Sequence, residues 1–244
     1  MIKPQKKWSD KDKADLINMW PSKKVTKQQI VSHFSRTYNS IKSMAKIIGL
    51  KRPKQNKEKL KKLNKNNKQS FYWLGFLMAD GHFSDRNELK FTLKNKQILQ
   101  DFVNFLGVDV NIRTYKDYWV VTIADAKNIK ELKYKYKICQ NKTKEPCDIS
   151  SIVNSKYFYD WFSGFFDGDG TICSRSVKGL INGVRIQIDN SWLESLIQIK
   201  VKLEKDNIRS RVYIDNQGYA RLVIFGIDRI KILRSKISQG YKLK

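Results

Sequence analysis

The chain has 244 residues, of which 41% are hydrophobic and 12% aromatic, so it can bury a substantial core. Its 49 lysine and arginine residues outnumber its 23 aspartate and glutamate residues, which gives a formal net charge of +26. This imbalance argues against an ordinary surface of mixed charge. It indicates a polyanionic partner, with nucleic acid first and an anionic membrane surface second.

Membrane proteins and disulfide-rich proteins are disfavoured classes. The longest apolar run, Phe71 to Ala79, is far below the roughly 20 residues of a spanning helix, and no signal peptide or membrane-surface helix is predicted. Cys139, Cys147 and Cys173 form no CxxC pair, so we predict neither a zinc site nor a disulfide framework. We expect a cytoplasmic location, and the abundance of Lys, Asn and Ile favours a bacterial or phage-infected cell.

Residues 1–52 predict a small domain of three short helices. The first runs from Asp10 to Met19 and stops before Pro21, and the second runs from Lys27 to Phe34 with Thr26 as its cap. After a turn, the third helix runs from Ser40 to Ile48. Apolar residues recur at helical spacing through this region, as a three-helix core requires.

This front domain resembles a helix-turn-helix DNA-binding module, although the match is not specific. The resemblance implies that the third helix enters a major groove, so Lys42, Lys46 and the preceding Arg36 are candidate DNA contacts. The alternative is a basic helical bundle that only follows phosphates. Residues 53–69 are rich in Lys and Asn with almost nothing to bury, and they predict a basic linker.

Residues 70–244 contain an internal duplication. The segment WLGFLMADG, Trp73–Gly81, matches FSGFFDGDG, Phe162–Gly170, with the two Asp-Gly pairs 89 positions apart. In each copy the motif is followed by strands, a helix, two further strands and a last helix. We therefore predict a first repeat over residues 70–138, an inter-repeat linker over 139–154 and a second repeat over 155–244.

The segments after each motif predict two hairpins and two helices per repeat. A capping box of Ser191 and Glu194 predicts the start of the middle helix in the second repeat. Residues 215–218 have turn chemistry between two strands. The predicted strands cover residues 88–94, 110–115, 118–123, 184–189, 211–215 and 219–225, and the last helices begin near Ala126 and Asp228.

The paired motifs resemble those of the LAGLIDADG homing endonucleases, in the single-chain form with two copies. The resemblance implies an α+β fold, a duplicated αββαββα arrangement with pseudo-twofold symmetry, here preceded by the three-helix domain. It also implies a monomer that cuts both strands of double-stranded DNA at a specific site and leaves staggered ends with 3′ overhangs, in the service of a mobile genetic element. The expected cofactor is Mg²⁺, or another divalent cation such as Mn²⁺.

The motif residues support the same interpretation independently. Small residues four apart, Gly75 with Ala79 and Gly164 with Gly168, let two helices approach closely. Their packing would bring the two terminal aspartates together, where the helix dipoles and mutual repulsion favour a bound cation. Asp-Gly is also a common turn pair, but two copies at the same repeat position favour function. The predicted catalytic and metal-binding acids are Asp80 and Asp169.

Four accessory assignments follow from position. The carbonyl oxygens of Ala79 and Gly168 are candidate additional metal ligands. The resemblance places a polar residue near the metal-bound water at Gln187 and a basic residue near the scissile phosphate at Lys127. The alternative for Gln187 and Lys127 is that both are ordinary solvent-facing residues. The sixth motif position is Asp167 in one copy and Met78 in the other, and we expect little catalytic consequence from this difference.

Alternation along the strands assigns one face of each sheet to the core and the other to DNA. On the core side we place Leu89, Phe91 and Leu93 in the first repeat and Val212 and Ile214 in the second. Arginine and glutamine on the other side can make paired hydrogen bonds to base edges. The predicted DNA contacts of the two repeats are Lys90, Thr92, Lys94, Arg113, Lys116, Arg175, Arg185, Gln187, Arg209, Arg211, Tyr213 and Arg221.

A second function remains open on the same scaffold. It is a nucleic-acid binder that does not cleave, either a DNA-binding regulator or an RNA maturase. The two aspartates favour cleavage, because a pure binder has no need for two acids beside phosphates. The helix-turn-helix resemblance favours DNA over RNA.

Overall fold

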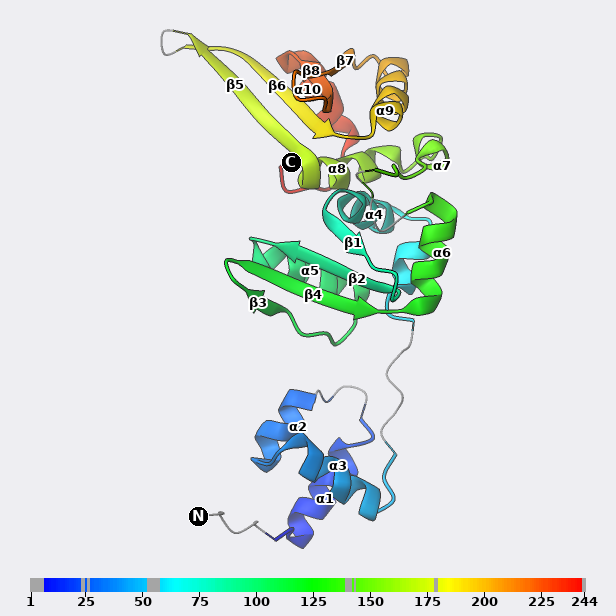
Figure 1. Cartoon of the computed structure of the whole chain (residues 1–244). Coiled ribbons are helices and arrows are strands. Elements are labelled where there is room, and N and C mark those ends of the chain that lie inside the picture. Colours follow the sequence, from blue (N-terminus) through cyan, green and yellow to red (C-terminus); the bar gives the residue numbers. More distant parts are fainter. Residues whose placement is uncertain are drawn as a thin grey trace. The chain divides into compact units, whose positions relative to one another are not determined.

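The computed structural model describes residues 7–22, 25, 27–51, 58–138, 142, 144–177 and 180–242. The chain divides into two compact units, Met1–Lys57 and Glu58–Lys244, and each is described by itself (Figure 1). Across these described ranges, no helix has both the length and the apolar character to cross a membrane.

The first unit contains three helices, α1 (Asp10–Met19), α2 (Lys27–Phe34) and α3 (Tyr38–Ile47), as predicted. Thr37 caps α3, so this helix begins two residues earlier than its sequence indicated. The predicted cap of α2, Thr26, lies outside the described residues. The small core of the unit consists of Leu16, Trp20, Ile30, Phe34, Ile41 and Ala45.

The segment after the first unit differs from the predicted linker. Residues 61–64 form a short 3₁₀ helix, η1, and Leu60 and Leu63 are fully buried in the core of the second unit. The Leu60 amide donates to the buried Asp125 carboxylate over 2.7 Å. Leu60 and Leu63 anchor this lysine-rich segment, because both pack against apolar residues of the first repeat. The basic composition of residues 58–69 therefore gave no indication that this segment packs as part of the second unit.

The first repeat has the predicted order of elements. Its strands form one antiparallel sheet in the order β1-β2-β4-β3, and Gly107, with φ +68°, ends the middle helix as expected for a glycine in the left-handed region. The elements are α4 (Lys68–Asp80), β1 (Gly81–Phe83), β2 (Glu88–Leu93), α5 (Lys96–Leu106), β3 (Arg113–Tyr115), β4 (Tyr118–Ala124) and α6 (Ala126–Tyr136).

The second repeat has the same topology, with sheet order β5-β6-β8-β7. Its first hairpin extends well beyond the rest of the sheet (Figure 1). The predicted capping box is wrong, because α9 starts after Trp192 with no side-chain cap. The inter-repeat segment adds α7 and buries Cys147, Ile149 and Ile152. The elements are α7 (Ser150–Val153), α8 (Phe158–Asp169), β5 (Gly170–Val177), β6 (Leu180–Asn190), α9 (Leu193–Lys205), β7 (Ser210–Ile214), β8 (Ala220–Phe225) and α10 (Ile227–Lys236).

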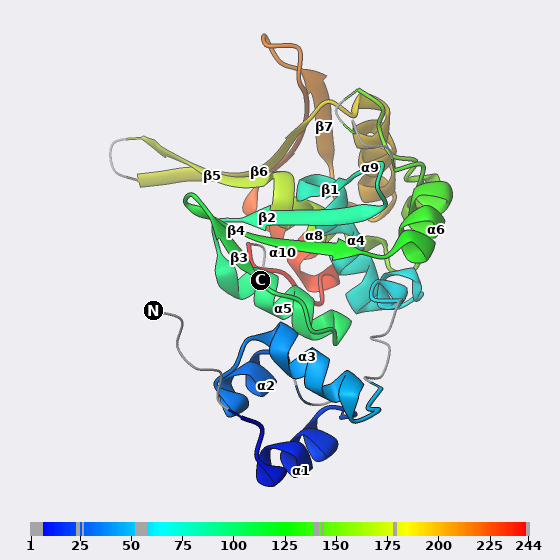
Figure 2. The same ribbon diagram turned by 60° about the horizontal axis from the view of Figure 1, so that its bottom comes forward.

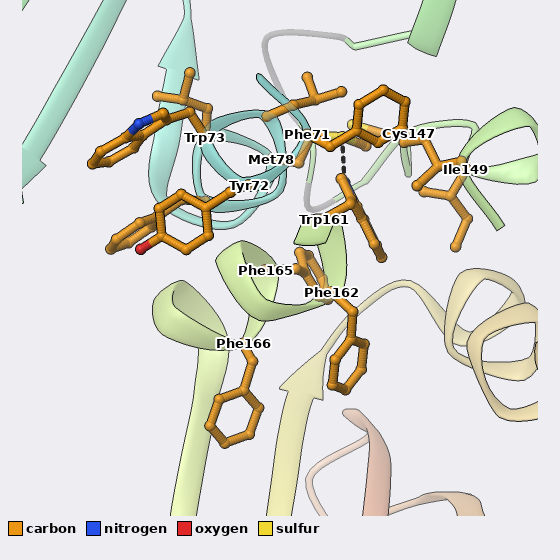
Figure 3. Close-up of a cluster of buried hydrophobic side chains, with 14 of the residues drawn as sticks. Phe71, Tyr72, Trp73, Met78, Cys147, Ile149, Trp161, Phe162, Phe165 and Phe166 are labelled. Carbon is orange, nitrogen blue, oxygen red and sulfur yellow. Dashed lines mark hydrogen bonds between the residues drawn. The ribbon is translucent and has the colours of Figure 1, made fainter. Parts of the chain in front are cut away.

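Helices α4 and α8 pack against each other and join the two repeats. A Cβ atom on Gly75 would collide with the Trp161 carbonyl oxygen, and a Cβ atom on Gly164 would collide with the Tyr72 carbonyl oxygen. These two contacts are reciprocal, as a pseudo-twofold axis between the helices requires. Aromatic side chains surround this contact, and the Trp161 indole N–H donates to the Met78 sulfur over 3.4 Å (Figure 3).

Within the described part of the second unit, helices cover one face of each sheet. Helices α4, α5 and α6 contact the first sheet, and α8, α9 and α10 contact the second (Figure 2). Leu89 and Phe91 are fully buried beneath the helices, whereas Lys90 and Lys94 are exposed, as alternation predicted. Ile214 is an exception with 58% of its surface exposed, because it ends its strand at the Asp215–Gly218 turn.

Candidate active site between the two repeats

The two motif aspartates end two packed helices. Asp80 is the last residue of α4 and Asp169 is the last residue of α8, and each is followed by a glycine that begins a strand. Ala79 and Gly168 face each other across the helix contact, since a Cβ atom on Gly168 would collide with the Ala79 side chain and lie 3.4 Å from Asp80 Oδ2. The duplicated helices therefore bring both carboxylates to one place, as the sequence predicted.

The electrostatics of the pair follow from this geometry. Burial, followed by the negative charge of Asp80, raises the pKa of Asp169 to about 6. Desolvation also raises the pKa of Asp80, against the opposing influence of Lys242 and Lys142. Both carboxyl groups are therefore harder to ionise when no cation is bound. A bound cation would stabilise their ionised forms.

Two lysines that sequence reasoning missed lie at this site. Lys142 Nζ donates to the carbonyl oxygens of Leu77, Met78 and Ala79 at 2.8–3.2 Å, at the C-terminal end of α4. Lys242 Nζ donates to the carbonyl oxygens of Gly168 and Gly170 at 3.2 and 2.7 Å, at the end of α8. Each ammonium group stabilises the negative end of one helix dipole.

The duplication contained a signal for these lysines. Each follows the last helix of its repeat, at a similar distance after the start of α6 or α10. The signal was weak, because the chain has many lysines and the two segments share little beyond a Lys-x-Lys pattern.

Asn190 holds one of the aspartates. Its Nδ2 donates to Asp169 Oδ2 over 2.6 Å, and its Oδ1 accepts from the Trp192 amide over 3.2 Å. By strand register, the counterpart of Asn190 in the first repeat is Leu93, whose side chain cannot donate a hydrogen bond. No hydrogen bond to the Asp80 side chain is found among the described residues. The two half-sites, one around Asp80 and one around Asp169, therefore differ.

The two accessory candidates, Lys127 and Gln187, pair with residues other than Asp80 and Asp169. Lys127 is exposed to solvent and donates to Glu58 over 2.5 Å, which raises the pKa of Lys127. Gln187 Nε2 donates to Asp189 over 2.8 Å. The structure brings neither side chain into contact with Asp80 or Asp169. The carbonyls of Ala79 and Gly168 do lie at the site, each paired with a lysine ammonium group.

The open face of the first sheet carries most of the predicted DNA contacts of that repeat. Lys90, Lys94, Arg113 and Lys116 are exposed, and Thr92 is half-buried. Lys90 and Lys116 lie over the exposed Tyr115 ring, at 5.7 and 5.9 Å from its centroid. Within the described contacts of this face, these cations pair with aromatic rings rather than with acids.

The open face of the second sheet is mixed in charge. Arg185, Arg209, Arg211 and Tyr213 are exposed. Arg221 pairs with Asp189 and, over 3.1 Å, with Asp215. Its interactions with Asp189 and then with Tyr213 raise the pKa of the guanidinium group. Arg221 is thus neutralised within the sheet. The side chain of Arg175 lies outside the described residues.

Within the first unit, α3 exposes Lys42 and Lys46. Arg36 differs, because its side chain is only 11% exposed and lies over the Trp8 ring at 4.4 Å. It also donates to the Lys7 carbonyl oxygen over 3.0 Å. Arg36 is therefore used to hold the unit together.

Comparisons with known proteins agree with this architecture. No family model matches the chain. A probable intron-encoded endonuclease, aI3 of Dictyostelium discoideum, is 26% identical over 172 residues, which cover 64% of this chain and 70% of the relative.

Solved structures of DNA-bound homing endonucleases are among those with a similar fold. The homing endonuclease I-WcaI bound to its DNA recognition sequence is 15% identical, with a TM-score of 0.54 over 79% of this chain and 91% of that one. The LAGLIDADG homing endonuclease I-GzeII in complex with its DNA target is 13% identical, with a TM-score of 0.52 over 73% and 87%. I-DmoI in complex with DNA and Mn is 16% identical, with a TM-score of 0.50 over 71% and 98%. Residues 58–244 therefore have the duplicated fold of the LAGLIDADG homing endonucleases.

Proposed function

We propose that this protein is a site-specific double-strand DNA endonuclease that hydrolyses one phosphodiester bond in each strand. The observation that carries the proposal is the pair of aspartates, one from each repeat, at the ends of α4 and α8 between two sheets with open faces. The fold is shared with structures of DNA-bound homing endonucleases. By their likeness, we propose staggered ends with 3′ overhangs.

The donors at the site fit a hard divalent cation. Asp80 and Asp169 supply carboxylate oxygens, and Ala79 and Gly168 supply carbonyl oxygens that now accept from lysine ammonium groups. No cluster of three or more His, Cys, Asp or Glu side chains occurs among the described residues, so phosphate oxygens and water would complete the coordination of Mg²⁺ or Mn²⁺. Such a cation would supply Lewis-acid chemistry and lower the pKa of a bound water.

The protein residues have separate roles in this proposal. Asp80 and Asp169 each serve one DNA strand. The ammonium groups of Lys142 and Lys242 neutralise negative charge that develops at the scissile phosphates, a role that the sequence had assigned to Lys127. Asn190 orients the Asp169 carboxylate through its 2.6 Å hydrogen bond.

The open faces of both sheets would bind the duplex on either side of the cut. Phosphate contacts supply affinity, and arginine and glutamine read base edges. A hollow of about 250 Å³ beside β7 is lined by Arg209, Arg211, Arg229 and Phe225, and its cations suit a backbone phosphate. In the first unit, Lys42 and Lys46 on α3 would add contacts in a further groove. We also propose that the protein acts in the cytoplasm of a bacterial or phage-infected cell, on the basis of its composition.

Cleavage selection on a randomised or genomic DNA library, with Mg²⁺ and with EDTA, tests the proposal. The wild-type protein should enrich one cut sequence only with the metal present, and the double variant Asp80→Asn, Asp169→Asn should enrich none. Specific binding by the wild type without any cutting would instead support the DNA-binding regulator. Preferential binding of structured RNA would support the maturase.

A further inference from the structure

One buried tryptophan connects the two halves of the candidate site. Trp192 lies between β6 and α9 with 3% of its surface exposed, and its ring stacks on Phe165 with 5.7 Å between centroids. Its indole N–H donates to the Lys142 carbonyl oxygen over 2.6 Å. Trp192 belongs to the second repeat, whereas Lys142 belongs to the segment that leaves the first.

The two ends of this contact reach different aspartates. On one side, the Lys142 side chain lies against the last carbonyls of α4, the helix that ends at Asp80. On the other side, the Trp192 amide donates to Asn190, which donates in turn to Asp169. A continuous series of hydrogen bonds thus runs from the Asp169 carboxylate to the end of α4.

The contact fixes where the Lys142 ammonium group can lie. A lysine side chain has four rotatable bonds, so its charge is positioned only if its backbone is held. The Trp192 indole holds the Lys142 backbone by a short, partly buried hydrogen bond to its carbonyl oxygen. Loss of that bond would remove this restraint on the Lys142 backbone and widen the range of positions open to the ammonium group.

In the half-site around Asp169, the lysine backbone is held by a different contact. The Lys242 backbone is held by Asp167, which accepts from the amides of Tyr241 and Lys242 at 2.8 Å. At the first-repeat position that corresponds to Trp192, the residue before the middle helix, stands Asn95, whose side chain accepts from the Gln97 amide. The tryptophan contact is therefore specific to the side that serves Asp80.

We propose that Trp192 is a positioning residue for DNA cleavage, which acts by holding the inter-repeat segment so that Lys142 lies beside Asp80. This inference rests on the proposed function. It adds a contact through which a buried residue of the second repeat sets the geometry around Asp80.

The test uses the full-length Trp192→Phe variant, which keeps an aromatic ring on Phe165 but lacks the N–H group. Single-turnover cleavage of the selected DNA should slow by about 10-fold or more, since small misplacements of a catalytic group are costly. DNA affinity measured with Ca²⁺ should stay within about twofold of the wild type. Trp119→Phe is the matched control, because no hydrogen bond from the Trp119 indole is found among the described residues, and it should cleave at the wild-type rate.

A double-mutant cycle separates positioning from general damage. If Trp192 acts through Lys142, the double variant Trp192→Phe, Lys142→Met should cleave no more slowly than Lys142→Met alone. Multiplicative losses would overturn the proposal, and so would wild-type cleavage by Trp192→Phe.

Amide hydrogen exchange gives a readout that needs no cleavage. Exchange should rise in Trp192→Phe at residues 77–81 and 142–146 and remain unchanged in α5 and β4. Unchanged exchange at both segments would overturn the inference. If the wild type cuts no DNA, the proposed function fails, and the exchange experiment still decides whether Trp192 holds the segment.

Discussion

At the scale of single residues, the site is organised around two buried carboxyl groups whose ionised forms are unfavourable without a bound cation. Burial and the charge of Asp80 raise the pKa of Asp169 from 3.8 to about 6. In the folded protein without metal, this carboxyl group therefore binds a proton more tightly than in the unfolded chain. Burial of this carboxyl group lowers the free energy of unfolding, as is common where charged groups are positioned for a ligand.

This arrangement predicts the pH dependence of stability. Because the folded pKa of Asp169 is raised, the free energy of unfolding should fall as the pH rises from about 4 to about 6 and then level off. Asp169→Asn removes this decrease and should be more stable than the wild type at pH 8 by about 1–3 kcal/mol in EDTA. Thermal melts at pH 4 and pH 8 measure the effect. Equal Tm differences at both pH values would contradict it.

At the scale of elements, two helices and two following segments define the site. Gly75 and Gly164 allow the backbones of α4 and α8 to touch, which sets the separation of the two aspartates. The segments after the last helices then return to the helix ends and deliver one lysine to each. Asp167 explains why the sixth motif position differs between repeats, since it accepts from Tyr72 across the interface and from the C-terminal segment.

The close approach can be tested by adding one methyl group. Gly164→Ala would place its Cβ against the Tyr72 carbonyl oxygen, which is backbone and cannot rotate away. We expect a loss of about 2 kcal/mol or more in unfolding free energy, which lowers the Tm by about 4–8 °C. Gly183→Ala is the matched control, because a Cβ there meets nothing within 4 Å. Similar Tm values for both variants would show that the helices do not pack as described.

At the scale of the whole molecule, the sequence predicted the duplication, the fold and the meeting of Asp80 with Asp169, because these depend on local periodicity and one repeated motif. It did not predict the positions of Lys142, Lys242 or the docked leucines Leu60 and Leu63. Those side chains lie in polar, irregular segments whose contacts are long-range and leave no periodic pattern. The role predicted for Lys127 had the same weak basis, since proximity in the fold had to be inferred from order along the chain.

The two-unit organisation predicts a separation of affinity from cleavage. The first unit, residues 1–57, carries 15 basic and 3 acidic residues. A variant limited to residues 58–244 should still cut the selected site but bind it about 10- to 100-fold more weakly. Its salt dependence should be shallower, by about one unit of slope for each phosphate that the first unit neutralises in the full-length protein. Titrations at several salt concentrations measure this. An unchanged slope would mean that the first unit does not bind DNA phosphates.

The central claim is that one aspartate from each repeat acts in a shared site. Strand-resolved cleavage of the selected DNA by Asp80→Asn and by Asp169→Asn, with Mg²⁺, tests it most directly. Each single variant should lose double-strand cutting by about 100-fold or more while its DNA affinity in Ca²⁺ remains close to wild type. Wild-type double-strand cutting by either variant would contradict the account.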